Sequence, residues 1–260
     1  MRKYRAPGGV GELRRARIRA AALGAGAAAY SLGILGEAVL GWPLDPRTAM
    51  LSELAARDRW HRRLFQCGDV ASAGCYLVAA GASRPGDSDP RGLLSASLAA
   101  FGAATIGDAL SPLDYPVSFD DRGSPRRGER PENSATSASH GRHYVTTTLA
   151  SAASVGLMAC YWREFGRQPG ASARRRLAAP VVLGLLAASA ASLASPKLQP
   201  GAVQRLYTLG FSALCVDFAR RDLARAAAAQ DLSCRRPPPG NRRRPVTLTG
   251  TGKTSPGSAP

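Results

Sequence analysis

Apolar residues fall into six runs along the chain, separated by polar or strongly charged segments. A helix needs about 20 mostly apolar residues to cross a bilayer. A soluble helical bundle would instead carry a polar face along each of its helices, and these runs lack one. The pattern therefore predicts an all-α integral membrane bundle of about six transmembrane helices, over Ala20–Leu40, Leu64–Ala82, Gly92–Leu110, Tyr144–Trp162, Leu177–Ala194 and Ala202–Phe218.

The first run has a second interpretation. It follows a basic leader, and Ala27–Ala29 offers the small side chains that a signal-peptide cleavage site requires. The run is long for the apolar part of a signal peptide, however, and further apolar runs follow it. We expect a retained first helix.

Composition divides the chain into three parts. Residues 1–19 form a basic leader, residues 20–220 hold the six-helix bundle, and residues 221–260 form a tail rich in Pro, Gly and Arg. Alanine dominates the apolar residues, and aromatic residues are only 6% of the chain. Small side chains suit helices that pack closely in lipid. The tail cannot bury enough apolar surface to order itself, so we expect it to be disordered.

The net charge of +17 is distributed as in a membrane protein. Basic residues cluster beside apolar runs, at Arg2–Arg19, Arg163–Arg176 and Arg220–Lys253. With the N-terminus inside, 23 of the 35 Lys and Arg residues fall in inner segments and 12 in outer loops. The positive-inside rule then predicts a multi-pass inner-membrane protein with both termini in the cytoplasm. Membrane lipids are the expected partners, and nucleic acid is not expected.

Four carboxylates lie within the predicted spans, where an ionisable group is costly and marks either a functional site or a structural pairing. These are Glu37, Asp69, Asp108 and Asp217. The topology places the first three toward the outer face, together with histidines at the start of the fourth span.

His140 and His143 are three residues apart, so they share a helix face near the level of Asp108. These three residues are the candidate catalytic site, as an acid/base pair, and in a further alternative they bind a divalent metal. The structural alternative is that Asp69 and Asp108 pair with arginines or cap helix ends. The five cysteines include no CxxC pair, and no cofactor-binding motif is found, so no other cofactor and no disulfide framework is expected.

Several segments resemble those of one family of bacterial multi-pass membrane proteins, DUF998. They are Leu51–Arg57 leading into Arg63–Phe65, Asp108–Asp114, Ser139–His143, and Gly201 with Gln204–Arg205. The resemblance covers about residues 20–220. It implies a helical membrane bundle and no assigned function.

Two classes of function stay open on the sequence alone. The first is a non-catalytic membrane protein, either an accessory of the cell envelope or a carrier of a small solute. The second is an intramembrane enzyme that acts on a lipid-like substrate through Asp108, His140 and His143.

Overall fold

The computed structural model describes residues 10–83, 90–114 and 137–235. This part of the chain is all-helical and contains no strand, which confirms the predicted fold class. Two short 3-10 helices, Leu51–Ala55 and Pro196–Leu198, and one π-helical turn, Trp162–Gly166, join the long helices. The six long helices are α1 Val10–Val39, α2 Arg62–Ala82, α3 Pro90–Ala109, α4 Ala138–Tyr161, α5 Ala173–Ser192 and α6 Pro200–Arg235.

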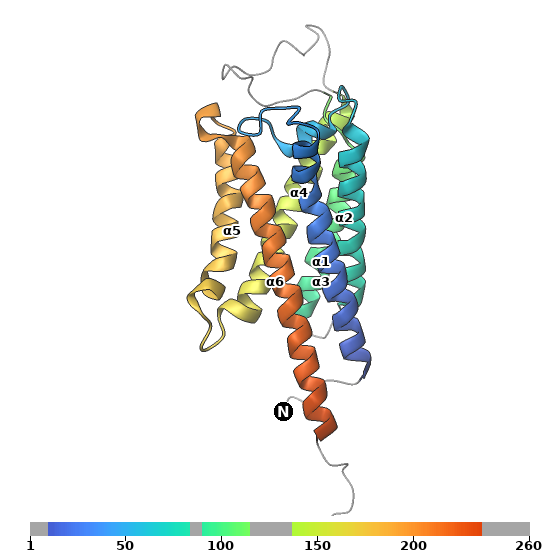
Figure 1. Cartoon of the computed structure of the whole chain (residues 1–260), viewed down its shortest axis with the longest axis vertical. Coiled ribbons are helices and arrows are strands. Elements are labelled where there is room, and N and C mark those ends of the chain that lie inside the picture. The colour runs from blue at the N-terminus through green and yellow to red at the C-terminus, as the bar shows by residue number, and fades with distance from the viewer. Residues whose placement is uncertain (1–9, 84–89, 115–136, 236–260) are drawn as a thin grey trace, which may run out of the picture.

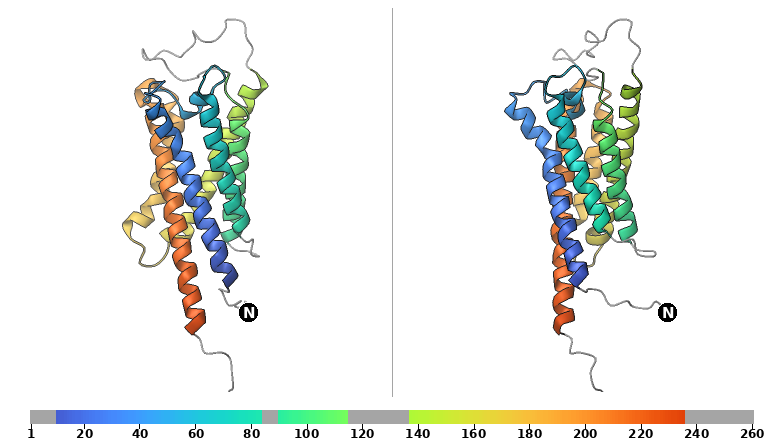
Figure 2. Two further views of the ribbon diagram at one scale, coloured as in Figure 1. Left: turned by 45° about the vertical axis from the view of Figure 1, so that its right-hand side comes forward. Right: turned by 90° about the vertical axis from the view of Figure 1, so that its right-hand side faces the viewer.

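The helices run alternately up and down and close into a ring (Figures 1 and 2). Each packs against its neighbours in sequence, and α1 also packs against α6. Residues 40–61, the cap segment, fold over one end of the bundle, which we call the cap end. Both ends of the described chain lie at the opposite end, the tail end.

Local sequence signals fix where the helices begin and end. The Ser137 hydroxyl accepts a hydrogen bond from the backbone N–H of His140 at 3.3 Å, so it caps the start of α4. Helix α6 starts at Pro200, a residue suited to the first helical turn because its missing N–H has no partner there. Helix α1 ends before Gly41, whose φ of +75° favours glycine.

The few aromatic side chains gather in the middle of the bundle. Tyr76 of α2, Phe101 of α3 and Phe211 of α6 are fully buried, with ring centroids 5.0 Å apart for Tyr76 and Phe101 and 5.1 Å for Phe101 and Phe211. Tyr30 of α1 contacts Phe101 edge-on at 5.7 Å. These large rings fill the space between alanine-rich helices, which have little other bulk to bury.

Helix α6 continues well beyond the predicted sixth span, to Arg235. The prediction of a disordered tail from residue 221 is therefore wrong for residues 221–235, and residues 236–260 lie outside the described part. The extension is held at its base by the ion pair between Arg19 and Asp222. Arg225 Nη1 also lies 2.7 Å from Glu164 Oε2. A run of alanines, strong helix formers, continues the helix. The leader is likewise helical from Val10.

Large apolar side chains are exposed on every long helix, with exposed fractions between 41% and 61% for six examples: Leu35, Val78, Leu93, Leu149, Leu177 and Leu206. In the described chain, three helices are long and apolar enough to cross a membrane, at Gly11–Val39, Gly92–Ala109 and Ala173–Ser192. These features indicate a membrane-associated protein. Within the same described residues, α2, α4 and α6 have no stretch that meets this measure, since Ser, Thr or charged residues interrupt their apolar runs.

Close packing of α2 on α3 depends on Gly102. A Cβ at this position would lie 2.9 Å from both the Ala73 carbonyl oxygen and Leu77 Cγ. We predict that Gly102→Ala forces the two helices apart and lowers the free energy of unfolding by about 1–3 kcal/mol. Gly74→Ala on α2 is the control, because nothing lies within 4 Å of its Cβ position. Thermal unfolding in detergent measures both variants, and equal midpoints would contradict the prediction.

Candidate functional site

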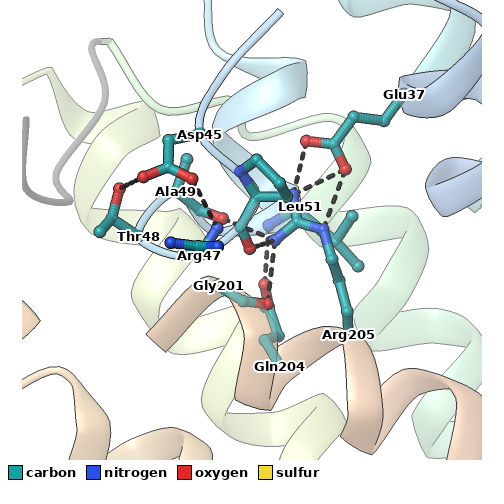
Figure 3. Close-up of polar contacts among 10 residues, drawn as sticks. Glu37, Asp45, Arg47, Thr48, Ala49, Leu51, Gly201, Gln204 and Arg205 are labelled. Carbon is teal, nitrogen blue, oxygen red and sulfur yellow. Dashed lines mark hydrogen bonds and ion pairs between the residues drawn. The ribbon is translucent and has the colours of Figure 1, made fainter. Parts of the chain in front are cut away.

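A buried ion pair joins the first and last helices at the cap end. Glu37 of α1 is fully buried, and Arg205 of α6 is only 7% exposed. Arg205 Nε donates to Glu37 Oε2 at 2.9 Å, and Arg205 Nη2 donates to Glu37 Oε1 at 2.6 Å (Figure 3). A guanidinium and a carboxylate in this two-point arrangement form one of the strongest side-chain pairings in proteins.

The remaining donors of Arg205 hold the cap segment. Nη1 donates to the carbonyl oxygens of Pro46 at 2.9 Å, Ala49 at 2.8 Å and Gly201 at 2.9 Å. The neighbouring Gln204 accepts a hydrogen bond from the backbone N–H of Leu51 at 2.7 Å (Figure 3). Position 201 must be glycine because a Cβ there would lie 2.7 Å from the Pro46 carbonyl oxygen. We use the term clasp for Glu37, Arg205 and the three carbonyl groups that accept hydrogen bonds from Arg205.

Asp108 and His143, two of the three predicted site residues, lie together at the cap end. Asp108 is in the last turn of α3, and His143 Nδ1 lies 3.1 Å from its Oδ1 atom. The hydroxyls of Thr146 and Thr147 donate to the same oxygen at 2.9 and 2.7 Å. The pair therefore sits on the seam between α3 and α4, buried on the histidine side and 24% exposed on the aspartate side.

Asp69 of α2 adds a second carboxylate to this region. It lies close enough to Asp108 for their charges to interact, and Tyr30 of α1 is within electrostatic reach of both. Within the described ranges, neither Asp69 nor Asp108 forms an ion pair with an arginine or lysine. We call Asp69, Asp108 and His143 the acid–histidine site. It has two acids and a single imidazole.

The other two acids of the predicted spans have fixed positive partners. Glu37 pairs with Arg205, as described above. Asp217 accepts hydrogen bonds from Arg221 Nε and from the Tyr161 hydroxyl, both at 2.6 Å. The structural alternative, pairing with arginine, therefore applies to these two residues and not to Asp69 or Asp108.

His140, the third predicted site residue, faces a different group. Its Nδ1 accepts a hydrogen bond from the backbone N–H of Asp114 at 3.2 Å. The Asp114 carboxylate accepts two hydrogen bonds from Ser137, both at 2.8 Å. Burial raises the pKa of Asp114, but the Ser137 hydrogen bonds and the charge of Arg57 outweigh it and leave the pKa below its usual range. His140 thus belongs to the junction that starts α4.

The metal alternative needs at least three ligands around one point. Over residues 10–83, 90–114 and 137–235, no group of three His, Cys, Asp or Glu side chains lies close enough to hold an ion. The predicted set of Asp108, His140 and His143 is divided, because His140 turns to Asp114. What remains is an acid–imidazole pair with a nearby second acid, which can accept, hold or release a proton.

The ion pair between Glu37 and Arg205 was not predicted from the sequence. The signal was present, since each is the conspicuous charge of an apolar run and both fall near the outer level of the predicted topology. Opposite charges at one depth in two spans are candidates for an ion pair, because each offsets the cost of burying the other.

The clasp generates a stability prediction. Glu37→Gln keeps the shape of the side chain but leaves the Arg205 charge buried and uncompensated, so we expect a loss of about 3–5 kcal/mol in the free energy of unfolding. Asp45→Asn is the control in the same cap segment, because Asp45 bonds only Arg47 and Thr48 locally, and it should cost less than about 1 kcal/mol. Thermal unfolding in detergent compares them.

A second variant separates the clasp from a general effect of mutation at the cap end. Glu37→Leu combined with Arg205→Leu removes both charges, and a double variant more stable than Glu37→Gln is expected. Equal stability of Glu37→Gln and Asp45→Asn would show that the ion pair does not hold the cap.

Comparison with known proteins assigns the chain to a family. No curated protein and no solved structure matches it. A family model matches residues 23–221, which is most of the chain and includes part or all of every long helix. The family is described as protein of unknown function (DUF998). The chain belongs to the DUF998 family.

Proposed function

We propose that the protein is a six-span integral protein of a bacterial inner membrane that carries a proton or a small cationic solute through its acid–histidine site. The cap end faces the outside, and both termini lie in the cytoplasm. The carrier is non-catalytic.

The arrangement of the helices supports six spans. Helices α1, α3 and α5 are long and apolar enough to cross a membrane. Helices α2, α4 and α6 alternate with them around the ring. Because the two sets alternate, a bilayer that surrounds α1, α3 and α5 also surrounds α2, α4 and α6. Exposed apolar side chains on all six helices would then face lipid rather than water.

The distribution of arginines supports the orientation. Helix ends at the tail end carry a dense set of basic residues, and cytoplasmic flanks of membrane helices carry such an excess. The described members of this set are Arg14, Arg15, Arg17, Arg163, Arg167, Arg174, Arg175, Arg176, Arg220, Arg221 and Arg225.

The observation that carries the proposed activity is the charge balance of the acid–histidine site. Asp108 is paired with a titratable imidazole and Asp69 lies near Asp108, whereas Glu37 and Asp217 each have a guanidinium partner. An acid inside a membrane without a fixed counter-charge is costly unless it takes up a proton or a cation. The site is thus suited to bind a positive charge reversibly, which a carrier requires.

The alternative of an intramembrane enzyme has less support. An acid–imidazole pair acting as a general base needs the reacting hydroxyl or water within about 3 Å of the imidazole. The hydroxyls of Thr146 and Thr147 donate to the Asp108 carboxylate, and that of Thr146 also lies 2.9 Å from the backbone oxygen of His143. A group positioned for attack is therefore not found among these side chains.

The orientation predicts the location of reporter fusions. Fusions after Arg167 and Arg225 should report the cytoplasm, and a fusion after Asp58 in the cap segment should report the outside. Paired reporters that are active on opposite sides of the membrane make the measurement. A periplasmic signal at Arg225 would show that α6 does not cross and would remove the six-span topology.

The activity predicts different effects for the two histidines at the start of α4. Purified protein in vesicles with a trapped pH-sensitive dye should move protons when Na⁺, K⁺, choline or putrescine is applied on one side. His143→Gln should lower the rate by at least about tenfold, because Asp108 loses the titratable imidazole that lies 3.1 Å from its Oδ1 atom.

His140→Gln is the matched control and should keep most of the rate, since His140 serves the Asp114 junction. Equal losses in the two variants would contradict the assignment to His143. A folded wild-type protein that moves no protons with any of these cations would leave the non-catalytic accessory as the function.

A further inference from the structure

A groove of about 770 Å³ opens at the cap end, on the outside of α2 and α3. Its rim is basic and carries Arg57, Arg62 and Arg63. Its wall below the rim is apolar and includes Val70 and Ala71 of α2, and Leu110 lies beside the rim. The groove lies apart from the acid–histidine site, none of whose three residues lines it.

The basic rim is unusual for this chain. The other dense clusters of arginine in the described helices lie at the tail end, as the positive-inside rule requires, whereas these three side chains lie at the opposite end. A cluster of arginines on the outer side is not what that rule predicts. A specific role for the cluster would explain why it is there.

The positive charge of the rim is only partly neutralised. Arg57 Nε lies 3.6 Å from Asp114 Oδ1, and Asp114 is also held by Ser137. Arg62 donates to the backbone carbonyl of Arg57 at 3.2 Å, a contact that leaves its charge in place. Arg63 is exposed and has no acidic partner within the three described ranges. The rim therefore presents a surplus of donors suited to a phosphate group.

The wall gives the groove the shape of a lipid site. Gln66 Nε2 donates to the Ala109 carbonyl at 2.9 Å and ties α2 to α3 beneath the rim. The groove follows α2 from Arg63 to Ala71. The eight steps between these residues correspond to about 12 Å along a helix axis. Val70, two turns below the start of α2, is 41% exposed, so apolar surface continues down from the charged rim along α2.

We propose that this groove binds an anionic phospholipid, with the phosphate headgroup at Arg57, Arg62 and Arg63 and an acyl chain along α2. A free anion would use the rim alone and leave the apolar wall uncovered. A neutral lipid would use the wall and leave the surplus charge uncovered. This inference rests on the proposed insertion in a bilayer and is independent of the proposed carrier activity.

The test measures lipid binding to the full chain, purified in detergent and stripped of lipid. Dioctanoyl phosphatidylglycerol should bind at least tenfold more tightly than dioctanoyl phosphatidylcholine, as counted by native mass spectrometry. Arg62→Gln combined with Arg63→Gln should weaken phosphatidylglycerol binding roughly 30-fold, because each arginine near a membrane surface contributes about a fivefold factor. Ala71→Trp, which fills the wall without changing charge, should also weaken it.

A matched pair of arginines at the tail end controls for net charge. Arg175→Gln combined with Arg176→Gln should bind phosphatidylglycerol as the wild type does, and so should Asp108→Asn, which tests the carrier proposal and not this one. Equal binding of the two lipids, or an equal loss in the tail-end variant, would overturn the proposal. Full competition by glycerol 3-phosphate with no effect of Ala71→Trp would assign the rim to a free anion and overturn it as well.

Discussion

The ion pair between Glu37 and Arg205 is the interaction on which the cap end depends. It joins α1 to α6 and so closes the ring of helices, and the same guanidinium orders the cap segment through the carbonyls of Pro46 and Ala49. Burying either charge alone would cost several kcal/mol, whereas together they satisfy each other and the surrounding backbone. The cap segment also has a small apolar cluster, in which Leu44, Ala49 and Leu54 pack with Phe65 of α2, and the arginine supplies its polar contacts.

The polar groups of α2, α3 and α4 differ from the fixed ion pairs because their charge can change with pH. Arg205 and Arg221 neutralise Glu37 and Asp217, while Asp108 faces the imidazole of His143 and Asp69 lies close enough to Asp108 for their charges to interact. Structural pairs in membrane helices join acids to guanidinium groups, which stay charged at all relevant pH values. An imidazole changes its charge near neutrality. The contrast divides the bundle into a rigid seam between α1 and α6 and a titratable seam between α3 and α4.

The sequence predicted the number of long helices and the approximate place of each along the chain, because apolar runs report both. It therefore placed Asp108 and His143 at one level, and the structure brings them together. Apolar runs do not report how a helix is rotated or what a preceding loop offers, so the turn of His140 toward Asp114 could not be predicted. Apolar runs also do not predict polar helical extensions. Helix α6 continues to Arg235, and Arg19 and Glu164 form ion pairs with Asp222 and Arg225 of this extension. These ion pairs join residues far apart in the sequence, so the sequence alone did not predict them.

The clasp also has a consequence for how the chain is made. Its two residues are 168 positions apart. A ribosome adds about 5–20 residues per second, so Glu37 waits on the order of 10–30 s for its arginine. During that time the acid must stay protonated, remain at the membrane surface or be shielded by another protein. A chain that stops before α6 keeps an acid in its first helix without the arginine that neutralises it in the complete fold.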